Sequence, residues 1–312
     1  MHRSIRALLP IGALALAACA GPAALPQHPL AGRIWDVAQH RFIEPGEAER
    51  RIAAADVALL GETHDNPIHH EIQLRLLRAD ASAGRRPALA MEQLDADRQA
   101  DVDAAIARGV TAHGVLVAAR ASSGWDWTHY APLISFALTL RLPVVGLGVS
   151  RHGAQPILEK GLSALGPDER ERLALARTWN PERERAMRHA IVEGHCGQTS
   201  PLDDRLVDVQ RMRDAVMADR ILAHAGGGVV AILGRGHARA DLGVPLYLAA
   251  RSRGVRVISV GLVETDADIA FPARYPEAAP GRYDLLWFTP EARRADSADS
   301  CAAFRGAKLP AG

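Results

Sequence analysis

The sequence predicts an α/β fold in which a mostly parallel β-sheet is flanked by helices and carries an inserted helical subdomain. Three observations lead to this prediction: short apolar runs recur, stretches with helical periodicity follow them, and one long segment contains helical patterns only. Continuous apolar runs are typical of strands buried on both faces, as in parallel sheets covered by helices. With 312 residues, 48% of them hydrophobic, the chain can bury such a core without disulfide support.

Strands and helices are expected to alternate in the sheet domain, which comprises residues 33–154 and 226–290. The apolar runs predict strands at 57–60, 87–91, 143–147, 229–233 and 255–260, and an edge strand at 283–288. The spacing of apolar residues predicts helices over 67–81, about 95–107 and 130–141, and a further helix containing Leu246 and Leu248.

Residues 155–225 interrupt the alternation and form the expected helical subdomain. Apolar periodicity predicts three helices there, at about 155–165, 168–193 and 202–224, with an interruption at Pro181. No strand is expected in this segment. The polar, Ala-rich end, residues 291–312, is left without assigned structure.

The N-terminus has the pattern of a bacterial lipoprotein signal. Two arginines precede the apolar run 7–18, which is too short for a stable membrane span. The order Leu-Ala-Ala-Cys over 16–19 predicts cleavage after residue 18 and lipidation of Cys19, although an ordinary cleaved signal stays open. Residues 19–32 then form a tether, and we expect an outer-membrane lipoprotein that is periplasm-facing or surface-exposed.

The chain is near neutral, with 37 basic and 36 acidic side chains. A nucleic-acid partner is not expected, because such a partner normally requires a basic excess. An oxidising compartment would permit a disulfide between Cys196 and Cys301, but their spacing in the sequence does not establish one.

Polar side chains follow the predicted strands, at the sheet edge where ligands of parallel sheets bind. The residues expected to face this crevice are Glu62, His64, Glu92, Arg151 and His237. Carboxylates and imidazoles in one crevice can support acid–base chemistry, or a divalent metal on His64 and His237. Two simpler interpretations stay open: histidines bonded to loop backbone, and Glu92 as part of a helix start.

Several common site motifs are excluded. Gly234 and Gly236 are not followed by a third glycine at 239, which is arginine, so a dinucleotide-binding loop is rejected. The serine-hydrolase elbow, the phosphate-binding loop and the His-Glu-x-x-His zinc motif do not occur in the sequence.

The sequence resembles the ChaN-type haem-binding lipoproteins of the wider Tiki/TraB/erythromycin-esterase superfamily. The resembling motifs occur in consistent order between residues 33 and 262: 59–67 with His69 and His70, 91–93, 127–132, 142–144, 194–197, 209–218, 234–237 and 243–245. Each motif is short, and their combination and order carry the resemblance.

The resemblance implies a haem-binding lipoprotein of iron uptake. It implies haem in the crevice beside the helical subdomain, tyrosine ligation, and a homodimer that stacks two haems. The implied iron-ligand candidates are Tyr130, His129 and His195, and the implied partners of the propionates are Arg151, Arg213 and Arg239. Apolar walls are expected from Trp125, Trp127, Leu133 and Met217.

Two other functions stay open. The superfamily also contains hydrolases, so Glu62, His64, Glu92 and His237 could form the catalytic group of a metal-dependent hydrolase. The third alternative is a lipoprotein that retains the fold as an interaction module.

Overall fold

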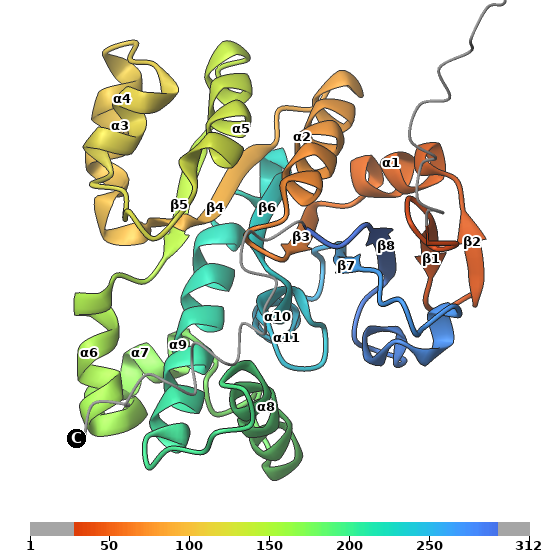
Figure 1. Cartoon of the computed structure of the whole chain (residues 1–312). Coiled ribbons are helices and arrows are strands. Elements are labelled where there is room, and N and C mark those ends of the chain that lie inside the picture. The colour runs from red at the N-terminus through yellow and green to blue at the C-terminus, as the bar shows by residue number, and fades with distance from the viewer. Residues whose placement is uncertain (1–27, 293–312) are drawn as a thin grey trace, which may run out of the picture.

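The computed structural model describes residues 28–292 and has three layers, with an eight-stranded sheet between two layers of helices (Figure 1). The strand order is β2-β1-β8-β7-β3-β6-β4-β5. The strands are β1 (Ile34–Asp36), β2 (Arg41–Ile43), β3 (Val57–Glu62), β4 (Ala88–Asp95), β5 (Val144–Gly148), β6 (Val229–Gly234), β7 (Val257–Glu264) and β8 (Leu285–Thr289). The pairs β1–β2 and β1–β8 are antiparallel, and the other neighbours are parallel. The predicted fold class, a mostly parallel sheet flanked by helices, is therefore confirmed.

The central strands are apolar because both of their faces are covered. All six residues of β3 are buried, with Leu59 in the core on one face and Leu60 in the core on the other. Strand β6 alternates in the same way, with Ala231 and Ile232 on opposite faces. Successive side chains of a strand point to opposite faces, so a strand covered on both sides is apolar along its length, and the one charged residue of β3, Glu62, is at its carboxyl end.

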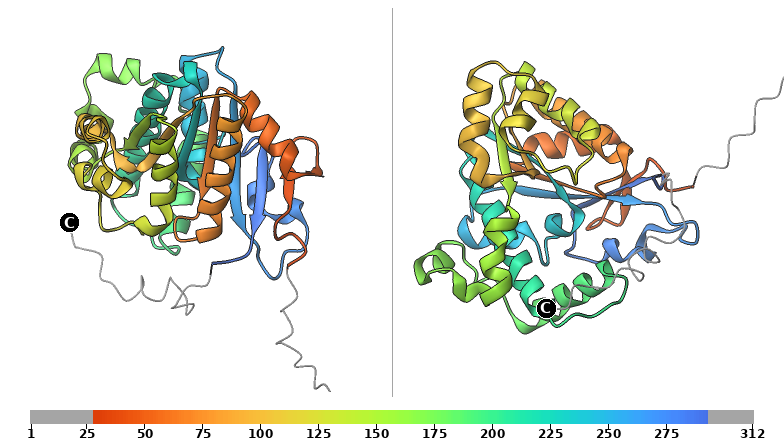
Figure 2. Two further views of the ribbon diagram at one scale, coloured as in Figure 1. Left: turned by 90° about the horizontal axis from the view of Figure 1, so that it is seen from above. Right: turned by 60° about the vertical axis from the view of Figure 1, so that its left-hand side comes forward.

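The two helical layers come from different parts of the chain, as the edge-on view shows (Figure 2). One layer holds α1 (Pro45–Ala54), α2 (Pro67–Ser82), α3 (Gln99–Ala107), α4 (Ala112–Ala118) and α5 (Trp127–Thr139). The other holds α6 (Arg151–Lys160), α7 (Pro167–Arg172), α8 (Pro181–Gly194), α9 (Asp203–Leu222), α10 (Arg235–Ala238) and α11 (Val244–Arg251). Helix α9 packs on β5 and α11 and joins α6 and α8 to the rest of the layer.

One expectation about the sheet domain is wrong. Residues 283–288 were expected at an edge, but β8 lies between β1 and β7. The covering strands β1 and β2 have three residues each, too few to produce a periodic pattern. The helix expected over about 95–107 is present: a 3₁₀ turn, Ala96–Arg98, follows β4 and leads directly into α3.

The segment 155–225 contains helical elements only, namely most of α6, then α7, α8 and α9, with short 3₁₀ turns. Its description as a separate subdomain stays a prediction. No helix between residues 28 and 292 is long and apolar enough to cross a membrane.

Several predicted features lie outside the described residues. These are the signal segment 1–18, Cys19, most of the tether, most of the polar tail and Cys301. Cys196 is disulfide-bonded, and the other two cysteines of the chain are both outside the described range.

Candidate functional site

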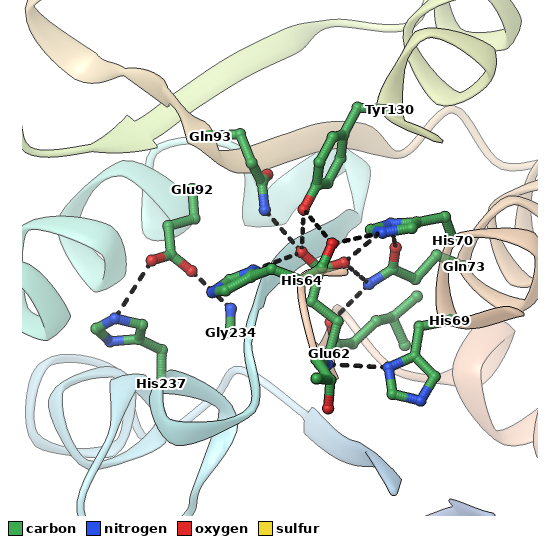
Figure 3. Close-up of polar contacts among 12 residues, drawn as sticks. Glu62, His64, His69, His70, Gln73, Glu92, Gln93, Tyr130, Gly234 and His237 are labelled. Atoms are coloured by element: carbon green, nitrogen blue, oxygen red, sulfur yellow. Dashed lines mark hydrogen bonds and ion pairs between the residues drawn. The ribbon is translucent and has the colours of Figure 1, made fainter. Parts of the chain in front are cut away.

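The carboxyl ends of three parallel strands bring the expected acidic and imidazole side chains together (Figure 3). Strand β3 ends at Glu62, opposite Gly234 at the end of β6. His64 follows β3, and His237 lies on α10 directly after β6. Glu92 comes from β4, the other neighbour of β6. The crevice therefore forms where the parallel order places it.

A bulge in β4 turns two consecutive side chains toward this crevice. Met91 pairs with Gly146 and Asp95 with Gly148, so four steps along β4 match two along β5. A Cβ at Gly146 would lie 2.8 Å from the carbonyl oxygen of Asp95, so the bulge needs glycine there. As a result, Glu92 accepts a hydrogen bond from the backbone N–H of Gly234, and the next side chain, Gln93, donates a hydrogen bond to Glu62.

Glu62 is the centre of the site, and its carboxylate is fully buried. Five side chains donate hydrogen bonds or an ion pair to it: Tyr130 (2.6 Å), His64 (2.8 Å) and Gln93 (2.9 Å) at Oε1, and Gln73 (2.7 Å) and His70 (3.2 Å) at Oε2. Burial raises the pKa of Glu62, but hydrogen bonds from His64 and His70 outweigh burial and hold that pKa at about 2. The carboxylate is therefore ionised.

His70 is the positive partner of this carboxylate. Its Nε2 faces the carbonyl oxygen of His64 at 3.0 Å, and its Nδ1 faces Glu62 Oε2 and Gln73 Oε1, both at 3.2 Å. Because both nitrogens face acceptors, both must carry a proton. Burial alone would lower the pKa of His70. The adjacent Glu62 carboxylate raises this pKa by more than burial lowers it, so the net change is an increase, in agreement with an imidazolium.

A second buried ion cluster closes the other side of the crevice. His237 lies between two carboxylates, with Nδ1 2.6 Å from Asp214 Oδ1 and Nε2 3.5 Å from Glu92 Oε1. Burial lowers the pKa of His237, but the two carboxylates raise it to about 10. Burial also raises the pKa of Glu92, but His237, His64 and the Gly234 N–H bring it to about 2. The ion pairs of His237 on α10 with Asp214 on α9 and with Glu92 on β4 therefore connect these three elements.

The crevice opens into a cavity of about 990 Å³ beneath α8 and α9. Its apolar wall includes Trp125, Val149, Met187, Ile191, Met217 and Leu242. Its polar lining includes Glu62, His64, Glu92, His195, Asp214, Arg213, Arg235, His237 and Arg239. Apolar walls with a few convergent polar groups are typical of sites for small molecules and cofactors.

The structure does not bring every expected ligand to the cavity. Tyr130 is only 1% exposed and lies behind Glu62. His129 stacks on His70 with 5.2 Å between ring centroids and does not line the cavity. Arg151 is exposed at the start of α6, also away from the lining. Of the expected apolar walls, Trp127 and Leu133 pack in the core on the far side of the sheet.

Four important members of the site were not among the expected site residues: His70, Gln73, Gln93 and Asp214. His70, Gln93 and Asp214 lie within resembling motifs, so their place in the motifs was a signal, although their partners were not evident. Gln73 is on the buried face of α2 among apolar residues. A buried glutamine needs hydrogen-bond partners, so its position among apolar residues could have indicated that it contacts a polar site residue.

A metal centre finds no support in this arrangement. Within residues 28–292, no group of three or more His, Cys, Asp or Glu could hold a metal ion. His64 and His237, the expected metal pair, bind separate carboxylates. The metal-dependent hydrolase is therefore not favoured.

Comparisons with known proteins identify the family and the fold. Residues 49–248 match the family described as "Haem-binding uptake, Tiki superfamily, ChaN". The chain is similar to the structure "Cofacial heme binding to ChaN of Campylobacter jejuni", with 21% identity, a TM-score of 0.67, and coverage of 81% of this chain and 95% of that one. It is more distantly similar to an erythromycin esterase variant, EreC, in its open conformation, with 14% identity, a TM-score of 0.39, and coverage of 85% and 84%.

No curated protein sequence matches the chain. The likeness to the Campylobacter structure shows a shared fold, and the family match extends over most of the described residues. The chain therefore belongs to the ChaN haem-binding uptake family of the Tiki superfamily.

Proposed function

We propose that this protein binds haem for haem and iron uptake, and that it holds the haem in the cavity between the strand ends and helices α8 and α9. The observation that carries the proposal is the combination, in one cavity, of an apolar wall with an arginine whose guanidinium forms no close ion pair within the described residues. Arg213 lines the cavity and forms no ion pair or hydrogen bond with any other residue in the described range. Membership of the haem-binding family supports the same ligand.

The residues of the cavity fit haem in three respects. The volume of about 990 Å³ lies within the range of roughly 300–1,000 Å³ that is usual for such ligands. Met187, Ile191 and Leu242 offer an apolar face to the porphyrin. Arg213 offers a guanidinium to a propionate, whereas Arg239 is already paired with Asp241.

We further propose that the protein is an outer-membrane lipoprotein, anchored through Cys19 and periplasm-facing or surface-exposed. The Leu-Ala-Ala-Cys order directly after the apolar run supports lipidation. A Cys19→Ala variant should leave the membrane fraction and appear in the soluble fraction. If it stays in the membrane fraction, the anchor is not at Cys19.

A homodimer is also proposed, because the Campylobacter protein is described as binding haem cofacially. Light scattering of the mature chain with and without haem tests it. A monomer in both conditions would contradict the dimer but leave haem binding open.

Hemin titration of the mature chain, followed in the Soret region, tests the central proposal. The expected result is a saturable change that ends at a fixed ratio of haem to chain. A linear, non-saturable increase, identical to that of a protein without a haem site, would contradict it.

A further inference from the structure

We propose that a disulfide between Cys196 and Cys301 ties the end of α8 to the C-terminal segment at the mouth of the cavity, and that this bond controls how fast haem enters and leaves. A disulfide-bonded cysteine, Cys196, lies directly beside two residues that line the cavity, Gly194 and His195. This regulation presupposes the proposed haem binding and the proposed lipidation of Cys19.

Cys196 has two candidate partners within its own chain, Cys19 and Cys301, and both lie outside the described residues. A disulfide forms through a free thiolate, so a sulfur that carries a thioether-linked lipid cannot form one. Cys19 is the proposed site of that lipid. Cys301 is therefore the partner that remains.

The C-terminal segment leaves the described structure at the edge of the sheet where the crevice lies. The carbonyl oxygen of Pro290, just after β8, accepts a hydrogen bond from Asn66 Nδ2 at 3.1 Å. The backbone N–H of Ala292 donates to Glu264, the last residue of β7, at 3.0 Å. An extended chain covers about 3.3–3.6 Å per residue, so residues 293–301 can span about 30 Å.

The exit point and Cys196 border the same cavity. Thr63, three residues before Asn66, lines the cavity together with His195, and a volume of about 990 Å³ keeps these two sides within the reach of residues 293–301. A bond from Cys301 to Cys196 would therefore lay this segment, which we call the strap, at the cavity mouth.

The backbone at Cys196 is unusual for a cysteine. Its φ is +59°, in the left-handed region, and Gly197 follows with a φ of +76°. A Cβ disfavours this region, and glycine usually fills it at the end of a helix. Helix termination therefore does not explain a cysteine at this position, whereas the bond that its sulfur makes does.

The end of α8 gains a link from this bond that its backbone does not provide. A small apolar cluster holds the middle of the helix: Met187, Ile191, Val207 and Leu242. Further on, the backbone N–H groups of Cys196 and Gly197 donate back to the carbonyl oxygens of Glu193 and Val192 in the same helix. The disulfide therefore joins this end of the cavity wall to a distant part of the chain.

Closing the bond removes two protons and two electrons from the two thiols. The electrons reduce one disulfide of an oxidant, a dithiol–disulfide oxidoreductase, to its dithiol form, and a dithiol reductant reverses the reaction. The closed strap obstructs the mouth in both directions, so it should slow haem entry and haem release together and change Kd much less.

Peptide mapping of the exported full-length chain, purified from membranes and digested with trypsin without reductant, tests the pairing. Cleavage at arginines yields the peptides 189–205, with Cys196, and 295–305, with Cys301. We expect these two peptides to be joined and to separate on reduction. A bond from Cys196 to Cys19, or to a second copy of the chain, would overturn the proposal.

Haem release to excess apomyoglobin tests the regulation. We expect release from Cys301→Ser, and from the wild type treated with a phosphine reductant, to be faster than from the oxidised wild type by roughly a factor of ten. Ser300→Ala, which changes the neighbouring residue and keeps both cysteines, should release haem as the wild type does. The reductant should not alter Cys301→Ser, and circular dichroism verifies that each variant is folded.

The results separate this proposal from the proposed function. Equal release rates in the oxidised wild type and in folded Cys301→Ser would overturn the regulation and leave haem binding in place. Absence of saturable haem binding in every form would instead overturn the proposed haem function, and the peptide map would still report the pairing.

Discussion

The phenol oxygen of Tyr130 lies 2.6 Å from Glu62 Oε1, so Tyr130 supports the central carboxylate from the core side of the crevice. Replacement of Tyr130 by Phe should therefore leave saturable haem binding in place. The free energy of unfolding should fall by about 1–3 kcal/mol, because the buried carboxylate of Glu62 loses a hydrogen-bond donor. Urea unfolding and hemin titration of the same sample measure the two effects.

Tyr275→Phe is the control for this variant, since it removes a buried phenol oxygen far from Glu62, one that contacts Asp266 and Ile269. Loss of saturable haem binding in Tyr130→Phe, with binding intact in Tyr275→Phe, would show that the phenol of Tyr130 contacts the ligand after all.

Glu62→Gln should be among the most destabilising single substitutions in the site. It removes the negative partner of the His70 imidazolium and places an amide N–H₂ against donors that need an acceptor. Removal of one member of a buried ion pair costs about 3–5 kcal/mol. Urea denaturation measures this loss, and Glu49→Gln, which removes a surface partner of Arg75, is the control. Equal stability of the two variants would contradict the central role of Glu62.

The strands that build the crevice could be predicted because burial on both faces leaves continuous apolar runs in β3, β5 and β6, interrupted only by Glu62 at the carboxyl end of β3. Their parallel order was enough to bring Glu62, His64, Glu92 and His237 together. Strands β1 and β2 escaped prediction because three residues carry no period, and their pairing with β8 depends on contacts across most of the chain.

The partners of the site residues could not be predicted from the sequence. Glu62 meets Gln73 and Asp214 meets His237 across 11 and 23 positions, through the packing of α2 and α9 on the sheet. The motif around Tyr130 is recognisable in the sequence, but a motif does not say on which side of Glu62 its tyrosine lies. The way in which α5 packs on the sheet places the Tyr130 ring in the hydrophobic core, and this packing is not encoded in the motif itself.

His237 should make the stability of the protein depend on pH in the alkaline range. Its pKa is about 10 in the folded protein and near 6.5 when unfolded, so its stabilising effect is complete below pH 6.5 and is lost as the pH rises through 10. The free energy of unfolding, measured in urea at several pH values, should therefore fall between pH 6.5 and 10. His237→Gln should flatten this part of the curve.

The control for that measurement is His189→Gln, because His189 forms only an exposed ion pair with Glu193. Its pH profile should follow that of the wild type. If His237→Gln declines as steeply as the wild type, the imidazolium between Asp214 and Glu92 is not the source of the effect.

Arg213→Met should weaken haem binding without weakening the fold. The arginine forms no ion pair or hydrogen bond within residues 28–292 and only longer-range charge interactions with Asp95 and Asp214, whereas a propionate bound to it would lose a charged hydrogen bond. Such bonds contribute about 1.5–3 kcal/mol, which corresponds to roughly a 10- to 100-fold increase in the haem Kd. Arg151→Met is the matched control, since Arg151 is exposed and outside the cavity. Equal Kd values for the two variants would remove Arg213 from the binding site.

Gly234→Ala tests the position of His64 without changing any polar group. A Cβ at residue 234 would lie 2.9 Å from His64 Nε2 and 3.4 Å from Glu92 Oε2, so the imidazole must shift. The same methyl group at Gly236 meets no atom within 4 Å, which makes Gly236→Ala the control. Because polar groups that line a binding site must be held close to their productive geometry, Gly234→Ala should bind haem more weakly than the wild type and Gly236→Ala should not, as measured by hemin titration. A folded Gly234→Ala protein with the same haem Kd as the wild type would mean that the ring of His64 and the carboxylate of Glu92 do not form part of the haem site.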